Sequence, residues 1–337
     1  MFCNAAEVEL KEFLTGRCYH AAMTAAPLPF AALDRDTLTG LTGQEAATAR
    51  LDEWDERARE SGQIAPVHVM MLGLRRFETV NLAFGEEAGD SALVEVATRI
   101  QHFANEELEG EWLAARLSGG NFLLALNESC SRERWQWLAE TLADMIARPI
   151  LNSCSVGTMR LWPRSALVRA MPGEGADNLL ARLAETLARV QRQSGSRVQW
   201  ADGDMGLVGR SAQQMEADLL GALDRDEIEI LYQPQYALPG DRLVGAEALA
   251  RWQHPELGRI GASALFAIAE RADHVAQLSH HIATRALAGA AAWPEPLRLS
   301  LNITPADLAA NSFANSIAAA VVEADFSPDR LTLEITE

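Results

Sequence analysis

The chain has 337 residues, of which 48% are hydrophobic and 23% are charged, so it is long enough and apolar enough for two globular domains. Its formal net charge of −18 argues against a surface that binds nucleic acid or an anionic membrane. An anionic ligand would need a metal ion or well-placed arginines, because the only lysine is Lys11.

The sequence carries no signal of export or of membrane insertion. Four cysteines are scattered without a C-x-x-C pair, which favours a reduced, cytoplasmic setting. The first residues, MFCNAAEVELKEF, are acidic and lack the apolar core of a signal peptide. No apolar run approaches the roughly 18 residues that a membrane span needs, so we expect none in this chain.

The first domain is expected to begin after a lead-in of residues 1–33, to which the sequence assigns no role. The run DTLTGL at Asp36–Leu41 opens this domain. A helix is expected to follow it. The residues spaced for one face of that helix are Leu51, Trp54 and Ala58.

A central strand and a long helix come next. The apolar run VHVMMLGL at Val67–Leu74 predicts the strand. Asp90 is expected to cap the amino end of the helix, because a short carboxylate side chain accepts from free backbone N–H groups there. The apolar face of the helix carries Leu93, Val96, Ala97, Ile100 and Phe103.

Two apolar runs then flank the turn Ser118–Gly119–Gly120–Asn121. Adjacent glycines between apolar runs predict a β-hairpin, because its turn needs positive φ. Its strands are expected at Trp112–Leu117 and Phe122–Leu126. The remaining expected elements are a helix over Arg132–Ala147, a strand near Cys154–Leu161, a helix over Asp177–Gln193 and a linker at Val198–Val208.

These elements resemble a GGDEF domain of the diguanylate cyclase family over roughly Asp36–Trp200. The shared landmarks are DTLTGL, the ladder of Phe77, Asn81, Gly85, Gly89 and Asp90, RLSGGNF at Arg116–Phe122, SVG at Ser155–Gly157, and Gly195. The resemblance implies an α+β domain over residues 34–200, with a central, mostly antiparallel sheet flanked by helices.

The catalytic residues of that family are not matched. In the family, two acidic residues hold the metal that neutralises the triphosphate. Here the strand position is Gly73, and Gly120 and Asn121 stand in the turn after Ser118 and Gly119 where the acids belong. The guanine-reading Asn-Asp pair is reduced to Asn81. We therefore expect a degenerate domain without cyclase activity. Weak GTP binding and a regulatory homodimer remain open.

A second domain is expected over residues 217–337, after a linker and helix start at 201–216. The run LVGAEALARW at Leu243–Trp252 predicts a buried strand that leads into a helix, with Glu247 at the end of the strand. Alone, Glu247 also fits a paired structural carboxylate. Two later strands, near Leu297–Ile303 and Leu331–Thr336, carry Asn302 and Glu334 at similar depth. Such oxygen ligands at strand ends suit Mg²⁺ or Mn²⁺.

This region resembles the first half of an EAL domain, the cyclic-di-GMP phosphodiesterase family. The shared residues are YQP at Tyr232–Pro234, EALARW at Glu247–Trp252, HPELG at His254–Gly258, Phe266, Ala269–Glu270, the LNIT run at Asn302, and LEITE at Leu333–Glu337. The resemblance implies a TIM-like (β/α) barrel that hydrolyses cyclic-di-GMP to the linear dinucleotide pGpG.

The resemblance also implies roles for individual residues. Glu247, Asn302 and Glu334 would hold Mg²⁺ or Mn²⁺, and Glu337 would steady a loop beside the site. The residues that would contact the dinucleotide are Gln233, Leu249 at a guanine, and Arg251 at a phosphate oxygen. The alternative is that Arg251 pairs with a surface acid and Gln233 satisfies backbone groups.

A complete barrel of this type needs roughly 250 residues, more than 217–337 supply. We therefore expect an incomplete barrel and a chain that does not hydrolyse cyclic-di-GMP by itself. Two hypotheses follow. In the first, the chain belongs to a longer phosphodiesterase with an inactive, regulatory GGDEF domain. In the second, it is a non-enzymatic regulator that binds cyclic-di-GMP or GTP, or pairs with another protein.

Overall fold

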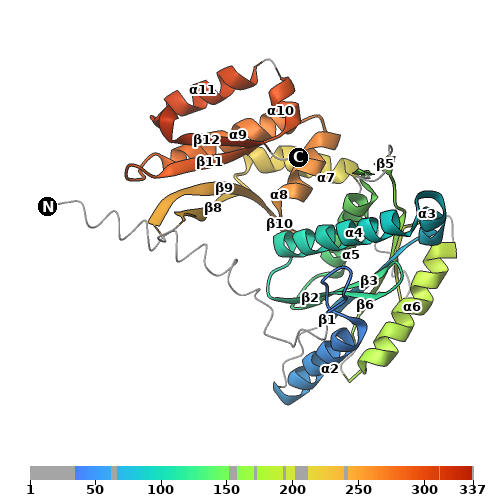
Figure 1. The fold of residues 1–337 in the computed structure, drawn as a ribbon. Helices are drawn as coiled ribbons and strands as arrows, with labels where there is room; N and C mark the ends of the chain where they lie inside the picture. The colour runs from blue at the N-terminus through green and yellow to red at the C-terminus, as the bar shows by residue number, and fades with distance from the viewer. Residues whose placement is uncertain are drawn as a thin grey trace. The chain divides into compact units, whose positions relative to one another are not determined.

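The computed structural model describes residues 35–61, 67–151, 158–170, 173–192, 195–201, 212–238, 242–310 and 312–335. These residues form two compact units, the first within 35–201 and the second within 212–335 (Figure 1). In the parts of the chain described, every helix is too short or too polar to cross a membrane.

The first unit is built on a five-stranded sheet with the order β2-β3-β1-β6-β7. Its strands are β1 (Val67–Leu74), β2 (Glu111–Ser118), β3 (Asn121–Asn127), β6 (Pro163–Arg169) and β7 (Val198–Trp200). All neighbouring pairs are antiparallel except β6 and β7. This confirms the expected mostly antiparallel sheet.

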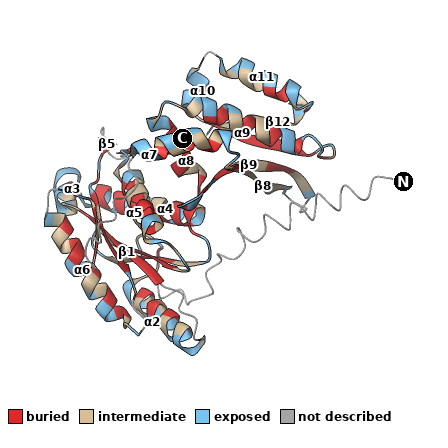
Figure 2. Cartoon of the chain, turned by 180° about the vertical axis from the view of Figure 1, so that it is seen from behind, coloured by how far each residue is buried: buried red, intermediate tan, exposed pale blue. Residues whose placement is uncertain are grey.

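Helices cover both faces of this sheet, which is why every residue of β1 is buried (Figure 2). On one face, α2 (Gln44–Ser61) and α6 (Ala176–Arg192) pack against alternate residues of β1 and β6. The other helices of this unit are α3 (Phe77–Phe84), α4 (Glu86–Glu107) and α5 (Arg132–Ala147). A short pair of strands, β4 (Ile150–Leu151) and β5 (Thr158–Met159), lies outside the sheet.

The predicted hairpin is confirmed, and its turn is tied to the start of the domain. Gly119 adopts a φ of +55°, as the turn requires. The guanidinium of Arg116 donates to the carbonyl of Gly119 at 3.1 and 3.2 Å and to Asp36 Oδ1 at 3.1 Å. Asp36 also accepts from Thr39 N at 2.8 Å. Two motifs 80 residues apart, DTLTGL and RLSGGNF, are therefore in direct contact.

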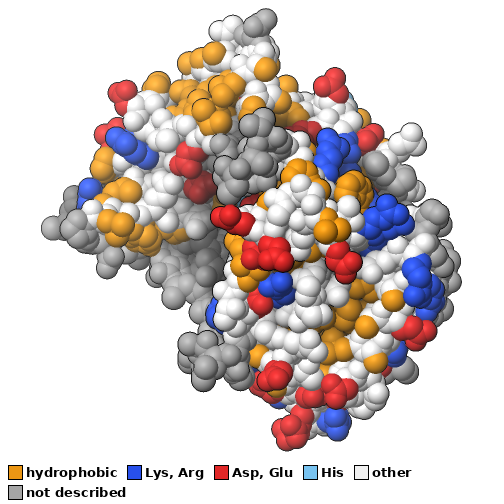
Figure 3. Space-filling model, turned by 45° about the vertical axis from the view of Figure 1, so that its right-hand side comes forward, with side chains coloured by type: hydrophobic (Ala, Val, Ile, Leu, Met, Phe, Trp, Pro, Cys, Tyr) orange, Lys and Arg blue, Asp and Glu red, His pale blue; other side chains and the backbone are white. Residues whose placement is uncertain are grey.

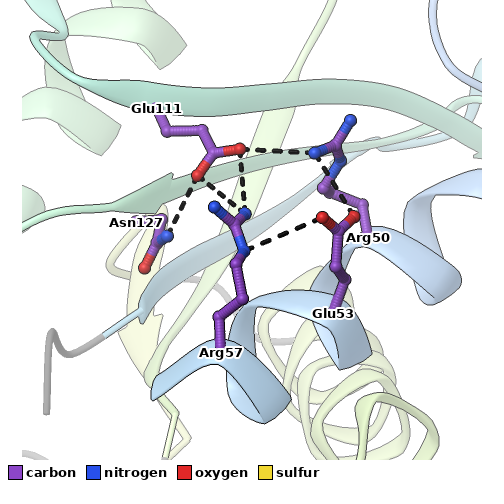
Figure 4. A network of polar contacts seen from close by, with 5 residues as sticks. All are labelled: Arg50, Glu53, Arg57, Glu111 and Asn127. Atoms are coloured by element: carbon purple, nitrogen blue, oxygen red, sulfur yellow. Dashed lines mark hydrogen bonds and ion pairs between the residues drawn. The ribbon is translucent and has the colours of Figure 1, made fainter. Parts of the chain in front are cut away.

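A polar network fixes α2 to the same hairpin (Figure 4). Glu111 on β2 accepts from Arg57 at 3.0 and 3.1 Å, from Arg50 at 3.3 Å and from Asn127 at 3.2 Å. Partial burial raises the pKa of Glu111, but the neighbouring donors, Arg57 and Asn127 among them, lower it more, so the pKa lies below its usual value. The carboxylate is thus held in its charged form between a helix and a hairpin.

Three expectations for the first unit were wrong. Asp90 does not cap a helix, because α4 already begins at Glu86 after Gly85. On the side of β1 away from β3, the neighbouring strand is β6, which we did not predict. Of the expected strand near Cys154–Leu161, only Thr158–Met159 is extended in the described residues. Val198–Trp200, assigned to the linker, adds to the sheet as β7. The SVG landmark lies outside the described residues.

The second unit contains (β/α) connections. Its strands are β8 (Ile228–Ala237), β9 (Arg242–His254), β10 (Gly258–Ile260), β11 (Arg298–Ile303) and β12 (Leu331–Ile335). The long β8–β9 hairpin is antiparallel, and β9, β11 and β12 are parallel neighbours. The helices are α7 (Ala212–Asp224), α8 (Ala262–Arg271), α9 (Val275–Ala290), α10 (Pro305–Ala309), α11 (Phe313–Glu323) and a 3₁₀ turn at Pro328–Arg330. Within the described residues the sheet is open.

The LVGAEALARW segment does not lead into a helix, which corrects our prediction. It continues as β9 to His254, because β8 pairs with it along nearly its whole length. Its residues alternate between two environments. Ala246, Ala248 and Ala250 are buried, and Ala246 and Ala248 pack with α9 residues, whereas Glu247 and Leu249 lie half-buried on the opposite face.

Helix α9 covers the apolar face of this sheet together with α11 (Figure 1). Tyr232 of β8 anchors that packing: its hydroxyl donates to the carbonyl of Ala286 at 3.0 Å, and its ring packs edge-on against Trp293 at 4.9 Å. Burial raises the pKa of Tyr232 to about 12. The hydroxyl therefore stays protonated and available as a donor.

Candidate functional site

The residues expected to bind metal come together on the face of the second sheet away from α9. Glu247, Asn302 and Glu334 lie on the parallel neighbours β9, β11 and β12, and each is half-buried. Asn302 Nδ2 donates to Glu247 Oε1 at 2.6 Å. Asn302 is also directly opposite Glu334 in the register of β11 and β12. Three residues spread over more than 80 positions therefore share one surface.

Two further residues, missed in the sequence, complete this polar cluster. Gln235 Nε2 donates to Glu334 Oε1 at 3.5 Å, and Gln235 Oε1 accepts from Ser300 Oγ at 3.3 Å. Ser300 lies directly opposite Glu247 in the strand register. Gln235 is two residues after Gln233, and Ser300 two before Asn302. The period of two along each strand was therefore the signal that could have found them.

The residues expected to contact a ligand lie on the same face. Gln233 of β8 is exposed and lies directly opposite Glu247 in the register of β8 and β9. Leu249 and Arg251 follow Glu247 at intervals of two along β9, so their side chains project from the same face of the sheet as the side chain of Glu247. Arg251 is only 9% exposed, and its Nη1 donates to the carbonyl of Ala250 at 2.8 Å. Glu337 lies outside the described residues.

The donor set of this cluster is compatible with a hard divalent cation. Two carboxylates and one amide converge, and carboxylate and amide oxygens are the ligands that Mg²⁺ and Mn²⁺ prefer. In the structure Asn302 presents its amide nitrogen to Glu247, so it would turn its oxygen toward a bound ion. No group of three or more His, Cys, Asp and Glu side chains that could hold a metal occurs in the described part of the chain. Other ligands, such as water, would therefore complete the coordination.

At one end of the first sheet, the residues at positions 73, 120 and 121 are Gly, Gly and Asn, so none of them is a carboxylate. A Cβ on Gly73 would lie 2.8 Å from Asn121 Oδ1 and would overlap Gln191 Nε2, so Gln191 of α6 fills the space of a side chain at residue 73. Leu74 N donates to the carbonyl of Gly120 at 3.0 Å, which joins β1 to the hairpin turn between Ser118 and Asn121. Gly73, Gly120 and Asn121, the positions at which the family resemblance implies metal-binding acids, are thus adjacent, but none of them carries a charge.

Asn81, the other position of interest in the first unit, lies on α3 against α4. Its Oδ1 is buried without a hydrogen-bond donor among the described residues and lies where a side chain on Gly89 would be. The Asn81 amide therefore occupies the space beside Gly89, and a side chain at position 89 would displace it. Position 82, next in the chain, is Leu82, which is 88% exposed.

Charge on the visible surface is mixed. Figure 3 shows arginine and acidic side chains side by side over one face of the molecule, without a continuous basic stripe.

Comparison with known proteins identifies both halves of the chain. Residues 216–337 match the family described as EAL domain, and residues 33–161 match the family described as diguanylate cyclase, GGDEF domain. The first unit thus carries the GGDEF match, and the second unit carries the EAL match.

The relatives of this chain include two proteins of Pseudomonas aeruginosa. The bifunctional diguanylate cyclase/cyclic di-GMP phosphodiesterase MucR is 26% identical over 90% of this chain and 44% of its own length. The cyclic di-GMP phosphodiesterase NbdA is 28% identical over 90% of this chain and 38% of its own length. The S helix-GGDEF-EAL structure of Vibrio cholerae LapD, bound to c-di-GMP, has a TM-score of 0.40 and 16% identity, over 98% of this chain and 73% of that one. The chain spans 36% to 53% of the first curated relatives it matches.

Proposed function

The chain is a GGDEF–EAL tandem protein of cyclic-di-GMP signalling, and from this premise we propose that the protein containing it is a metal-dependent cyclic-di-GMP phosphodiesterase. The observation that carries the proposal is the convergence of Glu247, Asn302 and Glu334 on one sheet face. A binding module would not need two carboxylates facing an anionic ligand, because like charges repel it. A divalent ion held between the two carboxylates would neutralise their charge and so remove this repulsion.

On this face of the sheet, one set of side chains would bind the ion and another set would bind the dinucleotide. Glu247, Asn302 and Glu334 would hold the ion, which lowers the pKa of a bound water and stabilises charge on the phosphate. Gln235 would orient Glu334, because it already donates to that carboxylate. Gln233, Leu249 and Arg251 would position the dinucleotide, with Arg251 toward a phosphate oxygen.

The test is turnover by the natural protein that contains this chain. It would be incubated with cyclic-di-GMP in Mg²⁺, in Mn²⁺ and in EDTA, and the linear dinucleotide would be quantified by chromatography. We expect product with either ion and none in EDTA. Protein that binds cyclic-di-GMP tightly but forms no linear product in any of the three conditions would contradict the phosphodiesterase proposal.

We also propose that the GGDEF domain is an inactive, regulatory partner. Its support is the neutral cluster of Gly73, Asn121 and Gln191, which offers no carboxylate to a metal. Charge stabilisation of a displaced pyrophosphate would therefore be missing. Incubation of the protein with GTP and Mg²⁺ should give no cyclic-di-GMP. Formation of this product above a no-enzyme blank would overturn the assignment.

A second function, binding without hydrolysis, is favoured by one observation. The described residues supply only two carboxylates to the cluster, fewer than a metal site of three acidic or histidine ligands would have. In that case cyclic-di-GMP would bind through Gln233, Leu249 and Arg251, and GTP could be the ligand of the first domain at Asn81. Saturable cyclic-di-GMP binding without product, by isothermal titration calorimetry, would identify this function.

A further inference from the structure

A buried carboxylate lies just beyond the strand that carries Asn302. Asp307 of α10 is only 1% exposed. Its Oδ2 accepts from the backbone N–H of Thr304 at 2.9 Å and from the Thr304 hydroxyl at 2.8 Å. Thr304 is the second residue after Asn302, so these two bonds hold the backbone at the point where β11 ends.

The same carboxylate is bonded to a second helix. Ser279 of α9 donates from its Oγ to Asp307 Oδ2 at 3.0 Å, and Ser279 is itself buried. Helix α9 packs on the apolar face of the sheet, away from the polar cluster. Asp307 therefore connects the end of β11 to the helix behind it. We call Ser279, Thr304 and Asp307 the Asp307 cluster.

Two further features restrict the backbone of Thr304. It is extended, with a φ of −97° and a ψ of 160°, and Pro305 disfavours the helical alternative for the residue before it. The backbone N–H of Asp307 donates back to the Thr304 hydroxyl at 3.2 Å, which completes a capping box at the start of α10. The chain just after Asn302 therefore has little conformational freedom.

Capping alone does not account for a buried carboxylate at this position. A neutral side chain such as glutamine also serves at the same place in a capping box. A carboxylate is costlier to bury, and Asp307 Oδ1 is buried without a donor among the described residues. Helix α10 is only 5 residues long, so little helix depends on this cap. The benefit is therefore expected at the end of β11, where Asn302 belongs to the candidate site.

Asn302 needs an accurate position to serve a divalent ion. Its Nδ2 donates to Glu247 Oε1 at 2.6 Å, so its amide must turn to present an oxygen. A side chain that turns on a fixed backbone reaches a defined position, whereas a mobile backbone spreads the oxygen over many. Displacement of a site group by about 1 Å can cost about 100-fold in rate.

We propose that Asp307 is a positioning residue for the amide ligand of the site. Through Thr304 and Ser279 it fixes the end of β11 to α9, and so holds Asn302 beside Glu247. Its hydrogen bonds go to the Asp307 cluster and not to the side chains expected to bind the ion, so it acts through the backbone. This inference rests on the metal-dependent site proposed above and adds the residue that orders it.

The experiment is isothermal titration calorimetry of the natural protein that contains this chain with Mn²⁺ alone. Asp307→Asn should weaken Mn²⁺ binding by about 10- to 100-fold, the usual cost of losing a residue that orients a metal ligand. Thr304→Val keeps the size of the side chain but removes the hydroxyl, and should weaken binding by about 2- to 10-fold. Thr304→Ser keeps the hydroxyl and should bind Mn²⁺ like the wild type.

Two control variants separate positioning from charge and from stability. Asp329→Asn removes the same charge at an exposed position of the 3₁₀ turn. Tyr232→Phe removes another buried hydrogen bond to α9, that to the carbonyl of Ala286, and so destabilises the same unit. Both proteins should bind Mn²⁺ with unchanged affinity, because neither residue is bonded to the end of β11.

The outcomes separate this inference from the proposed function. An Asp307→Asn protein with the same Mn²⁺ affinity as the Asp329→Asn and Tyr232→Phe proteins would overturn the positioning role alone. If Asp307→Asn does not fold, equal affinities of the Thr304→Val and Thr304→Ser proteins would overturn it. Wild-type protein that binds no Mn²⁺ would refute the metal site and this inference with it. Wild-type protein that binds Mn²⁺ but forms no linear product would contradict only the phosphodiesterase proposal.

Discussion

Strand pairing brings polar residues together in both sheets, but the cluster on the second sheet is acidic and the cluster at the end of the first sheet is neutral. In the second unit, parallel neighbours bring Glu247, Asn302 and Glu334 together, and neutral Gln235 and Ser300 connect them. In the first unit, antiparallel neighbours bring Gly73 and Asn121 together, and Gln191 fills the space between them. In both units, strand pairing brings residues that are distant in the sequence together. The chemistry of each site therefore depends on which side chains stand there, and the fold alone does not assign it.

Among substitutions that test this difference between the two sheets, the largest loss of activity is expected at Glu247. Glu247→Gln keeps the size of the side chain and an acceptor for Asn302, but removes the charge that a divalent ion needs. We expect kcat/KM for cyclic-di-GMP hydrolysis to fall by more than about 100-fold, because loss of residues that only orient metal ligands already costs about 10- to 100-fold. The rate of linear dinucleotide formation in Mn²⁺ measures it.

The control for that experiment is Glu323→Gln, which makes the same charge change at an exposed position of α11. It should retain full activity. Similar losses in both variants would show that net charge, and not the position of Glu247, controls the rate.

A smaller effect is expected at Gln235, which connects Ser300 to Glu334. Gln235→Ala should weaken the apparent affinity for Mn²⁺ by about 10- to 100-fold, because it frees the carboxylate that Gln235 orients. Activity as a function of Mn²⁺ concentration measures this affinity. Gln253→Ala, at an exposed glutamine of β9 that donates to Glu229, serves as the control. An unchanged Mn²⁺ dependence for Gln235→Ala would exclude a positioning role.

A substitution at Tyr232 can distinguish the structural role of the apolar face of the second sheet from the catalytic role proposed for its polar face. Tyr232→Phe removes the hydroxyl that donates to Ala286 and leaves that buried carbonyl without the bond. We expect a loss of about 1 kcal/mol in the free energy of unfolding, measured by chemical denaturation, with catalysis unchanged. Tyr236→Phe, at a residue that is 44% exposed, should change stability by less than about 0.5 kcal/mol. A loss of activity without a loss of stability would place Tyr232 in the site.

The smallest effect is expected at Glu111, in the network that joins α2 to the hairpin. Its folded pKa is lowered, so its charge stabilises the fold above the unfolded pKa, and this contribution is lost as the pH falls through the folded pKa. Glu111→Gln should destabilise the protein by about 0.5 kcal/mol or less near pH 7, because the carboxylate is partly exposed and screened. The difference from the wild type should decrease as the pH falls below the unfolded glutamate pKa of about 4.3 and vanish only below the lowered folded pKa. Denaturation at pH 7 and at a series of acidic pH values measures it, and a difference that grows in acid would contradict the assignment.

Much of the fold could be predicted because local patterns carry it. The strand Val67–Leu74 and the helix Arg132–Ala147 have the limits that periodicity predicted, and the double glycine marked the hairpin turn. The failures were β6, β7 and the continuation of β9 past Glu247. Strand partners decided these segments, and a partner distant in the sequence leaves no local pattern.

The sequence by itself determined which residue types stand at the candidate sites: the acids and the amide at Glu247, Asn302 and Glu334, and the loss of acids at Gly73 and Asn121. Only the tertiary structure decided their neighbours. Register between strands placed Gln235 and Ser300 in one cluster and Arg164 opposite Gly73. The physical reason is that side-chain identity is encoded locally, whereas proximity depends on backbone pairing between segments far apart in the chain.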